Sequence, residues 1–277
     1  MKKLVLFTLP LIMVLLQGCN NNPVIPEATQ IVLRGYLYAN EPVQDIEVMS
    51  SFPLGSSDST NPPITTATVA LLKSGNSYPL SPDTARPGYY YYQGTGLTVN
   101  VGDMFNIEVD YNGQSVTAAT VVPPKPQNVA LSVSNLHFRI DTIQVRFGTR
   151  ISVTGLDTAI VTWDNPDGQY FYVVTESIDS TAQLLRPDSS FTRRFTSQPT
   201  NENSYRINNN SILYTGKHVL KVYRVNKEYA DLYRSRQQDS RELNEPLTNV
   251  KGGLGIFSAF ASDSLYFTVS LDSSTSE

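Results

Sequence analysis

Apolar and polar residues alternate along much of this chain with the two-residue period of β-strands. The clearest example is 105–111, where four apolar side chains alternate with three polar ones. This segment stops at Asn112-Gly113, a pair typical of tight hairpin turns, and 115–122 has the pattern of the returning strand. Further strand patterns occupy 31–38, 68–72, 89–92 and 97–101. No helical period interrupts them, so the sequence predicts an antiparallel β-sandwich over 31–122.

The order of two of these strands resembles the small transthyretin-like or carboxypeptidase-regulatory modules. In those modules a strand beginning Gly-Tyr-Tyr precedes a strand of the pattern Gly-Asp-x-Phe/Tyr-x-Ile/Leu. Here the first pattern stands at 88–90 and the second at 102–107. The resemblance implies a module of this kind for 31–122.

Prolines follow the first predicted sandwich. Pro123, Pro124 and Pro126 fall within four residues, and proline is excluded from sheet interiors because it has no N–H to donate. We therefore expect a boundary here and a second, C-terminal sandwich over 127–277. Its predicted strands are 129–133, 140–147, 159–163, 170–174, 191–195, 204–207, 217–225 and 265–271.

The only tryptophan, Trp163, precedes a turn of Asn-Pro-Asp-Gly composition, and alternating aromatic residues follow at Tyr170 and Tyr172. This pattern resembles fibronectin type III and Ig-like domains, and we expect Trp163 to lie in the core. The predicted fold class is therefore all-β, with two sandwich modules of which the second is fibronectin III/Ig-like.

One segment departs from the β pattern. Tyr229, Leu232 and Tyr233 recur at helical spacing, which predicts one short amphipathic helix over about 227–238. Asn226 stands directly before it, where an N-cap residue is expected.

Three glycines, Gly252, Gly253 and Gly255, lie within four positions near the C-terminus. Such a cluster indicates positive φ or the close approach of another backbone segment. A phosphate-binding loop is the alternative, but such loops follow a strand and open a helix. These glycines follow a polar loop and lead into an apolar strand. We therefore expect them, with Phe257, to form a structural bulge or loop packed under the helix.

The helix and the glycine-rich segment 249–260 together resemble a family of Bacteroidota lipoproteins described as domain of unknown function 4249. The residues that carry the resemblance are Tyr229, Leu232, Tyr233, Glu245, Pro246, Asn249, Val250, Gly252, Gly253, Leu254, Gly255, Ile256 and Phe257. The resemblance implies an outer-membrane lipoprotein, often associated with TonB-dependent receptors. It brings no catalytic residue.

The first residues have the parts of a bacterial export signal. Two lysines precede a mostly apolar segment, 4–16, and a small residue precedes Cys19. This end of the segment resembles a lipobox, which implies cleavage before Cys19, a diacylglycerol on its sulfur and an acyl chain, such as palmitate, on its amine. We expect a signal peptide over 1–18, a lipidated tether over 19–30 and attachment to the outer membrane.

A membrane-spanning helix and an ordinary signal peptide are the two alternatives to the lipid anchor. A membrane-spanning helix needs about 20 apolar residues, whereas 4–16 is shorter and contains Pro10. An ordinary signal peptide with a chance cysteine stays open. The residues after Cys19 do not decide between the periplasmic side and the cell surface, because only Glu27 is acidic nearby.

Charge and cysteine content argue against several classes of partner and of reactive site. The formal net charge is −4 and no basic cluster is present, which argues against nucleic acid or an anionic membrane surface as a partner. Cys19 is the only cysteine. Once lipidated, it leaves no thiol for a disulfide, a nucleophile or a Cys-ligated zinc ion. We predict no cofactor and no metal.

Candidate catalytic groups are few. His137 and His218 are each flanked by strand residues, and a two-histidine metal site would need both. No Gly-x-Ser-x-Gly elbow occurs, although composition leaves a Ser-His-Asp hydrolase open. The turn 164–168 offers oxygen ligands for calcium, but capping of the turn backbone explains the same side chains. We therefore predict a protein that is not an enzyme.

Tyrosines give a stronger functional indication. The chain has 16 tyrosines, and four in succession, Tyr89, Tyr90, Tyr91 and Tyr92, place two rings on each face of a strand. We expect one pair to be exposed or at an interface, where it binds a partner. The predicted function is that of a binding or accessory subunit of a TonB-dependent transport complex. A surface adhesin or glycan-binding lipoprotein, and a hydrolase, are the alternatives.

Overall fold

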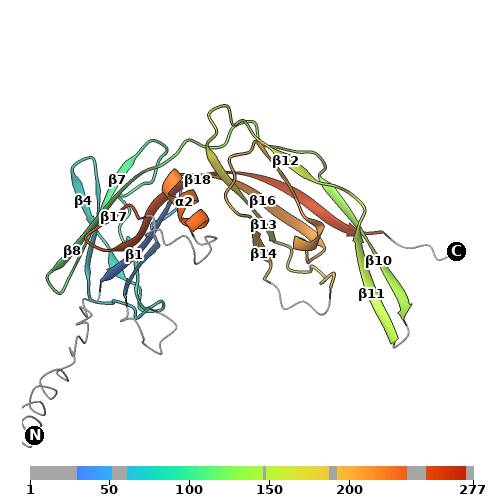
Figure 1. The fold of residues 1–277 in the computed structure, drawn as a ribbon, viewed down its shortest axis with the longest axis horizontal. Helices are drawn as coiled ribbons and strands as arrows, with labels where there is room; N and C mark the ends of the chain where they lie inside the picture. Colours follow the sequence, from blue (N-terminus) through green and yellow to red (C-terminus); the bar gives the residue numbers. More distant parts are fainter. Residues whose placement is uncertain (1–29, 52–60, 146–147, 187–191, 236–247, 273–277) are drawn as a thin grey trace, which may run out of the picture.

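The computed structural model describes residues 30–51, 61–145, 148–186, 192–235 and 248–272. These residues are mostly strands, with one α-helix, α2 (Lys227–Ser235), and one 3-10 turn, η1 (Asn209–Ser211). They form two β-sandwiches that lie side by side along the long axis of the molecule (Figure 1). The prediction of an all-β protein with two sandwiches and one short helix near the C-terminus is confirmed.

The first sandwich packs two sheets over an apolar core. One sheet has the order β17 (Val250–Lys251), β8 (Gln114–Val121), β7 (Met104–Tyr111), β3 (Thr68–Lys73) and β4 (Asn76–Pro79). The other continues from β18 (Leu254–Leu271) through β1 (Ile31–Tyr38), β2 (Asp45–Ser50) and β6 (Tyr89–Tyr91) to β5 (Ser81–Pro82). Asn112 and Gly113 have φ of 48° and 77° and join β7 to β8, as the hairpin signal predicted. The likeness to transthyretin-like modules stays a prediction.

The second sandwich pairs a large sheet with a small one. The large sheet contains β14 (Arg194–Thr196), β13 (Tyr170–Ser177), β16 (Gly216–Val225), β18, β10 (Asn135–Val145) and β11 (Gly148–Gly155). The small sheet has the order β15 (Ser204–Arg206), β12 (Ile160–Thr162) and β9 (Ala130–Leu131). Trp163 is 3% exposed in the core between them, and its ring centroid lies 5.3 Å from that of Phe171. The prediction that Trp163 is a core residue is confirmed.

The structure differs from the predicted elements of this region in a longer strand and an additional one. The predicted strand 140–147 is part of a longer hairpin, in which β10 begins at Asn135 and pairs antiparallel with β11, a strand that the sequence pattern did not predict. Helix α2 begins at Lys227, as expected, and is described as far as Ser235. The remaining part of the predicted helix, 236–238, lies outside the described residues.

Strand β18 belongs to both sandwiches. Its first part, up to Phe260, pairs in parallel with β1, and from Phe260 onward it pairs antiparallel with β16. At its end it pairs in parallel with β10, from Thr268 to Leu271. Figure 1 shows this strand in dark red running from one sandwich into the other. The two sandwiches are therefore joined by a continuous hydrogen-bonded sheet as well as by the proline linker.

This shared strand corrects the predicted division of the chain. The segment 249–260 was assigned to the C-terminal sandwich over 127–277. In the structure β17 pairs with β8 of the first sandwich, and Val250, Phe257 and Ala259 are buried in the first core. The reason is that the chain returns from α2 to complete both sheets of the first sandwich before it continues into the second.

The glycine cluster is the crossing between the two sheets of the first sandwich. Gly252 and Gly255 have φ of 79° and 116°, and a Cβ atom on Gly253 would lie 2.6 Å from the carbonyl oxygen of Ile31. On Gly255 it would lie 1.9 Å from the carbonyl oxygen of Leu33. The expectation of positive φ and close backbone approach is confirmed, although the neighbours are β8 and β1 and not the helix. The phosphate-loop alternative is wrong because the segment opens a strand.

Asn249 fixes this crossing from within the same motif. Its side-chain oxygen accepts a hydrogen bond from the N–H of Phe257 at 3.0 Å, and its amide donates to the carbonyl of Phe257 at 2.7 Å. The amide also lies 3.3 Å from the carbonyl of Ala119 on β8. Asn249 thus takes the place of a strand partner for Phe257, whose side chain is fully buried.

Replacing Asn249 by alanine is expected to lower the free energy of unfolding by about 3 kcal/mol, because the N–H and C=O of Phe257 would lose their partners in a buried position. Chemical denaturation of both proteins measures this difference. The matched control is Asn106→Ala on β7, an exposed asparagine, for which we expect a change within about 0.5 kcal/mol. Equal effects of the two substitutions would contradict the role assigned to Asn249.

Candidate binding site

A third apolar cluster lies where the two sandwiches meet, on the outer face of the shared sheet. Its buried members come from β13, β16, β18 and α2. The β1 residues Tyr36 and Tyr38 pack against it, while Leu33 and Leu37 of the same strand point into the first core. The alternation of strand side chains therefore gives β1 one apolar face and one tyrosine face.

The rings of this cluster pack in defined pairs. Tyr172 and Tyr223 stack at 4.8 Å between centroids with 11° between their planes, and Tyr38 stacks on Phe260 at 5.1 Å. Tyr229 of α2 meets Phe260 edge to face at 4.9 Å. Such pairs contribute about 0.5–1.5 kcal/mol each beyond the area they bury. The cluster thus holds α2 against the joint between the two sandwiches.

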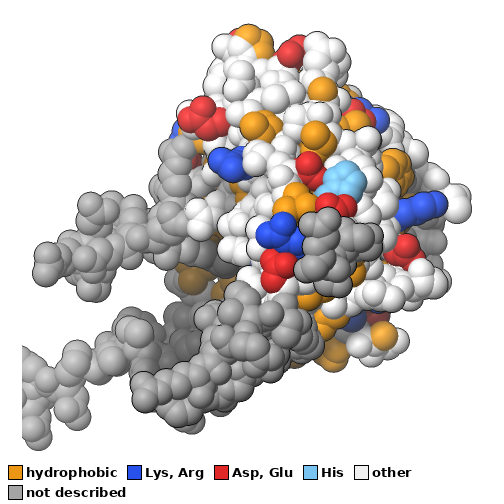
Figure 2. Space-filling model, turned by 90° about the vertical axis from the view of Figure 1, so that its right-hand side faces the viewer, with side chains coloured by type: hydrophobic (Ala, Val, Ile, Leu, Met, Phe, Trp, Pro, Cys, Tyr) orange, Lys and Arg blue, Asp and Glu red, His pale blue; other side chains and the backbone are white. Residues whose placement is uncertain are grey.

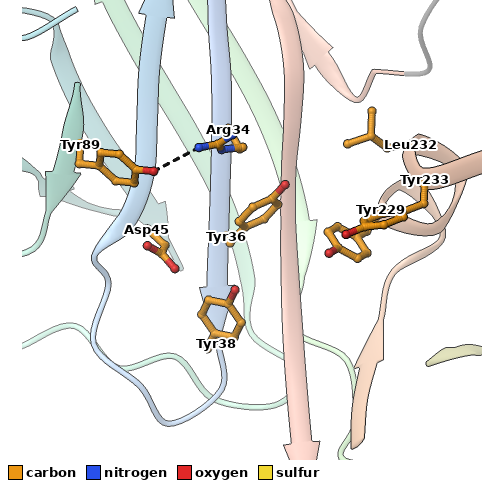
Figure 3. Close-up of a pocket in the computed structure, with 8 residues that line it drawn as sticks. All are labelled: Arg34, Tyr36, Tyr38, Asp45, Tyr89, Tyr229, Leu232 and Tyr233. Atoms are coloured by element: carbon orange, nitrogen blue, oxygen red, sulfur yellow. Dashed lines mark hydrogen bonds between the residues drawn. The ribbon is translucent and has the colours of Figure 1, made fainter. Parts of the chain in front are cut away.

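Beside this cluster the surface is hollowed. The cavity has a volume of about 310 Å³, and we call it the tyrosine hollow. It is lined by Arg34, Tyr36, Tyr38, Asp45, Tyr89, Tyr229, Leu232 and Tyr233. Figure 3 shows Arg34 and Tyr89 on one side, the α2 residues on the other, and Tyr36 between them. Strands β1, β2 and β6 supply the floor and α2 supplies one wall.

The two charged residues that line the tyrosine hollow, Arg34 and Asp45, are each paired with a charged residue outside it. Arg34 forms an ion pair with Glu47 on β2 and donates a hydrogen bond to the hydroxyl of Tyr89 at 3.1 Å. Burial lowers the pKa of Arg34, but the bond to Tyr89 and the charge of Glu47 outweigh it, so the pKa is raised. Arg86 lies 4.6 Å from the ring centre of Tyr89 and 3.6 Å from the carboxylate of Asp45.

Burial raises the pKa of two of the tyrosines that line the hollow. The pKa values of Tyr38 and Tyr229 lie well above the usual tyrosine value. In the adjoining cluster burial also raises the pKa of Tyr172 and of Tyr223. A phenol with a raised pKa stays protonated at neutral pH, so it donates and accepts hydrogen bonds but does not act as a base or nucleophile. The arrangement suits binding.

The four consecutive tyrosines lie in different environments. Tyr90 is fully buried in the first core, where its hydroxyl donates to Ile64 and accepts from the N–H of Ala67, both at 3.0 Å. Tyr92 packs against that core, and Tyr91 is half-buried on β6. Only Tyr89 lines the hollow. The predicted role of the four tyrosines in binding a partner stays a prediction, and of the four only Tyr89 lies at this cavity.

The sequence pattern points to Tyr89 but not to the other binding positions of the hollow. It gives Arg34, Tyr36 and Tyr38 only as strand residues, and Asp45 lies on β2, a strand that the pattern does not predict. The polar and aromatic residues at every second position of β1 were the available signal, because an ordinary exposed face of a strand carries fewer large rings.

The two histidines do not form a joint site. The Nδ1 atom of His137 on β10 lies 2.8 Å from the carboxylate of Asp157, while His218 on β16 is buried and stacked on Phe267 at 5.0 Å. Burial lowers the pKa of His218. Among the described residues, no group of three or more His, Cys, Asp or Glu side chains is placed to hold a metal ion.

The turn that was considered for calcium is held by protein contacts. Asp164 accepts a hydrogen bond from the side chain of Asn128 at 2.6 Å. The side-chain oxygen of Asn165 accepts from the N–H of Gln169 at 2.7 Å, and its amide donates to the carbonyl of Asn201 at 2.7 Å. These contacts account for Asn165 by capping of the turn backbone and for Asp164 by a side-chain hydrogen bond.

Several predicted features lie outside the described residues. These are Cys19, the signal peptide 1–18, most of the tether 19–30, and Glu245 and Pro246 of the family motif. No helix in the described part of the chain is long and apolar enough to cross a membrane. Figure 2 shows charges of both signs scattered over one end of the molecule, without a broad field of either sign on that face.

Comparison with known proteins assigns the chain to one family and finds distant likenesses to two solved structures. It is similar to the FN1-FN3 domains of chicken CNTN1, at 12% identity and a TM-score of 0.26, over 69% of this chain and 59% of that one. It is also similar to Titin-A168169, at 9% identity and a TM-score of 0.22, over 88% of this chain and 98% of that one. No curated protein matches the chain. The model of the family described as Domain of unknown function (DUF4249) matches residues 21–265, and the chain therefore belongs to that family.

Proposed function

We propose that this protein is a non-enzymatic, lipid-anchored binding protein of the outer membrane, acting as an accessory subunit of a TonB-dependent transport complex. The observation that carries the binding role is the tyrosine hollow, an open cavity lined by five tyrosines and by an arginine and an aspartate that are each paired with a charge outside it. Aromatic rings of this kind give large contact area at low cost in side-chain entropy, which is why tyrosine and arginine are frequent at the energetic centres of interfaces.

The position of the hollow in the chain supports a partner in or near the membrane. Cys19 is the proposed lipid site, and β1, which forms the floor of the hollow, begins at Ile31. The twelve residues of the tether 19–30 span at most about 40 Å when fully extended. A protein embedded in the same membrane would therefore be within reach of the hollow. Two or more acyl chains hold a protein on the membrane stably.

A glycan is the second candidate ligand. Tyr36 and Tyr89 lie beside the carboxylate of Asp45 and the guanidinium of Arg34, and sugars are bound by aromatic faces together with charged hydrogen-bonding groups. This observation favours a surface lipoprotein that binds glycans. The hydrolase alternative has less support, because the His137–Asp157 pair has the side chain of Asn135, and not a serine, at the other ring nitrogen of the histidine.

Photocrosslinking from within the hollow tests both candidates. A photoreactive benzoylphenylalanine replaces Tyr233, which lines the hollow, and cells that carry the full protein in its own membrane are illuminated. The matched control carries the same group at Tyr111, a half-buried tyrosine of β7. We expect an adduct with an outer-membrane transport protein from position 233 and none from position 111.

The identity of the crosslinked product distinguishes between the two candidate functions. An adduct with polysaccharide from position 233 alone would replace the transport proposal by the glycan one. Equal adducts from both positions, or none from position 233, would contradict a binding role for the tyrosine hollow.

A further inference from the structure

The backbone hydrogen bonding along the edge of β18 that faces β1 and β10 is interrupted. Along this edge β1 ends with the N–H of Ala39 donating to the carbonyl of Phe260 at 2.8 Å. The next contact is the N–H of Thr268, which donates to the carbonyl of Ser134 before β10 at 2.9 Å. The opposite edge of β18 is paired with β16 without a break from Phe260 to Val269. A gap therefore opens on one side of a strand that is fully paired on the other.

The alternation of a strand decides which groups face this gap. Phe260 and Thr268 both direct their backbone groups toward β1 and β10. Backbone groups on one edge recur every second residue, so Ser262, Ser264 and Tyr266 point the same way. Within the described part of the chain, the N–H and C=O groups of these three residues have no backbone hydrogen bond at this edge. We call these six groups the β18 slot.

The side chains at the β18 slot are largely accessible, and no strand in the described part of the chain pairs with this stretch of the edge. Tyr266 is 68% exposed, Ser264 is exposed and Ser262 is half-buried. Proteins commonly protect such edges with proline, lysine, a bulge or a covering segment, because unpaired backbone groups attract other strands. The pairing with β16 runs through these positions in regular register, and none of the three residues is proline or lysine.

We propose that the β18 slot binds an extended peptide segment of a partner protein by strand addition, between the ends of β1 and β10. A strand rises about 3.3 Å per residue, so a segment of about five to seven residues fits between the two flanking strands and satisfies all six groups. Strand addition takes its affinity from the backbone and its specificity from alternate side chains. This inference is independent of the tyrosine hollow and does not rest on the proposed function.

The side chains beside the β18 slot indicate which side chains a bound peptide segment should carry. Asp263 and Leu265 lie on the other face of β18 from Ser262, Ser264 and Tyr266, and Leu265 packs against the second core. Asp263 is half-buried and has no ion pair or hydrogen bond from its side chain among the described residues. A basic side chain beside Asp263, with an apolar one two positions away beside Leu265, matches this face.

A synthetic peptide of sequence Thr-Val-Thr-Lys-Thr-Val-Thr, with blocked ends and a fluorescent label, is the probe. Its central lysine has valine two positions away on either side, so it fits in both strand directions. Fluorescence anisotropy with the full chain in mild detergent should show saturable binding. The same peptide with glutamate at the centre should bind about two- to fivefold more weakly, as expected for a partly exposed ion pair.

Two substitutions at one position separate backbone from side-chain effects. Ser264→Pro removes one N–H of the slot and places the proline ring at this edge, so peptide binding should weaken about tenfold, because one backbone hydrogen bond is lost and the ring hinders the approach of a strand. Proline is tolerated here because this N–H faces away from β16. The matched control Ser264→Thr keeps the backbone and should bind as the unsubstituted protein does. Equal affinities of both variants would overturn the proposal.

Hydrogen exchange of the unsubstituted protein tests the slot without any substitution. In the free protein the amides of Ser262, Ser264 and Tyr266 should exchange fast, while those of Asp263 and Leu265, paired with β16, should exchange slowly. Saturating peptide should slow the first three. Slow exchange of these three in the free protein, or no change with peptide, would overturn the proposal. So would self-association of the chain that Ser264→Pro abolishes, since a second copy would then occupy the edge.

Discussion

Replacing Gly255 by alanine is expected to lower the free energy of unfolding by about 2–5 kcal/mol and to loosen the first sandwich. Gly255 has φ of 116°, a region that costs a residue with a side chain about 1–3 kcal/mol. The added Cβ would lie 1.9 Å from the carbonyl oxygen of Leu33, so β1 and β18 must separate locally, at a further cost of about 1–3 kcal/mol. Chemical denaturation followed by tyrosine and tryptophan fluorescence measures the change.

Gly75→Ala is the matched control for this substitution. Gly75 also has positive φ, 81°, but no atom lies within 4 Å of where its Cβ would be. Its replacement should therefore cost only the conformational term, about 1 kcal/mol. If both substitutions cost the same, the close approach of β1 to β18 is not the reason for glycine at position 255.

Cys19→Ala is expected to release the protein from the membrane fraction essentially completely, without changing its free energy of unfolding. The reason is that the proposed anchor consists of acyl chains attached at this residue, each buried methylene contributing about 0.8 kcal/mol to membrane binding. Fractionation of cells followed by denaturation of the released protein measures both properties. Mass spectrometry of the N-terminal peptide should show the lipid on the unsubstituted protein.

The neighbouring substitution Asn21→Ala provides the control, since it changes the tether but leaves the lipid site intact. It should stay in the membrane fraction. Retention of the Cys19→Ala protein in the membrane, or its release in an unfolded form, would contradict the assignment of Cys19 as the anchor.

Local features of the fold were predictable because they depend on residues close in sequence. The Asn112-Gly113 hairpin, the core position of Trp163 and the start of α2 at Lys227 all follow from turn chemistry, side-chain size and helical spacing. The double membership of β18 was not predictable in this way. Pairing of Val32 with Leu254 and of Val225 with Phe260 is set by packing between distant segments, and an alternating pattern does not name its partner strand.

The residues of the candidate site also divide into those that local sequence indicates and those that depend on contacts between distant segments. Tyr89 was found because four tyrosines in succession are conspicuous, and the α2 tyrosines were part of the family motif. Arg34 and Tyr36 could not be assigned to a site from sequence, because the hollow exists only once α2 has folded over the tyrosine face of β1. The β18 slot depends on where β1 stops and β10 starts along a third strand, which no local pattern encodes.

The shared strand β18 also determines when the protein can fold. Synthesis from the N-terminus produces β1 early, but β1 gains its parallel neighbour only when Leu254 to Phe260 have been made. The second sandwich needs the same strand, which lies between β16 and β10. Contacts between such distant segments form late and slowly. Neither sandwich can therefore be completed until nearly the whole chain has been made, and removal of the last 25 or so residues would destabilise both sandwiches at once.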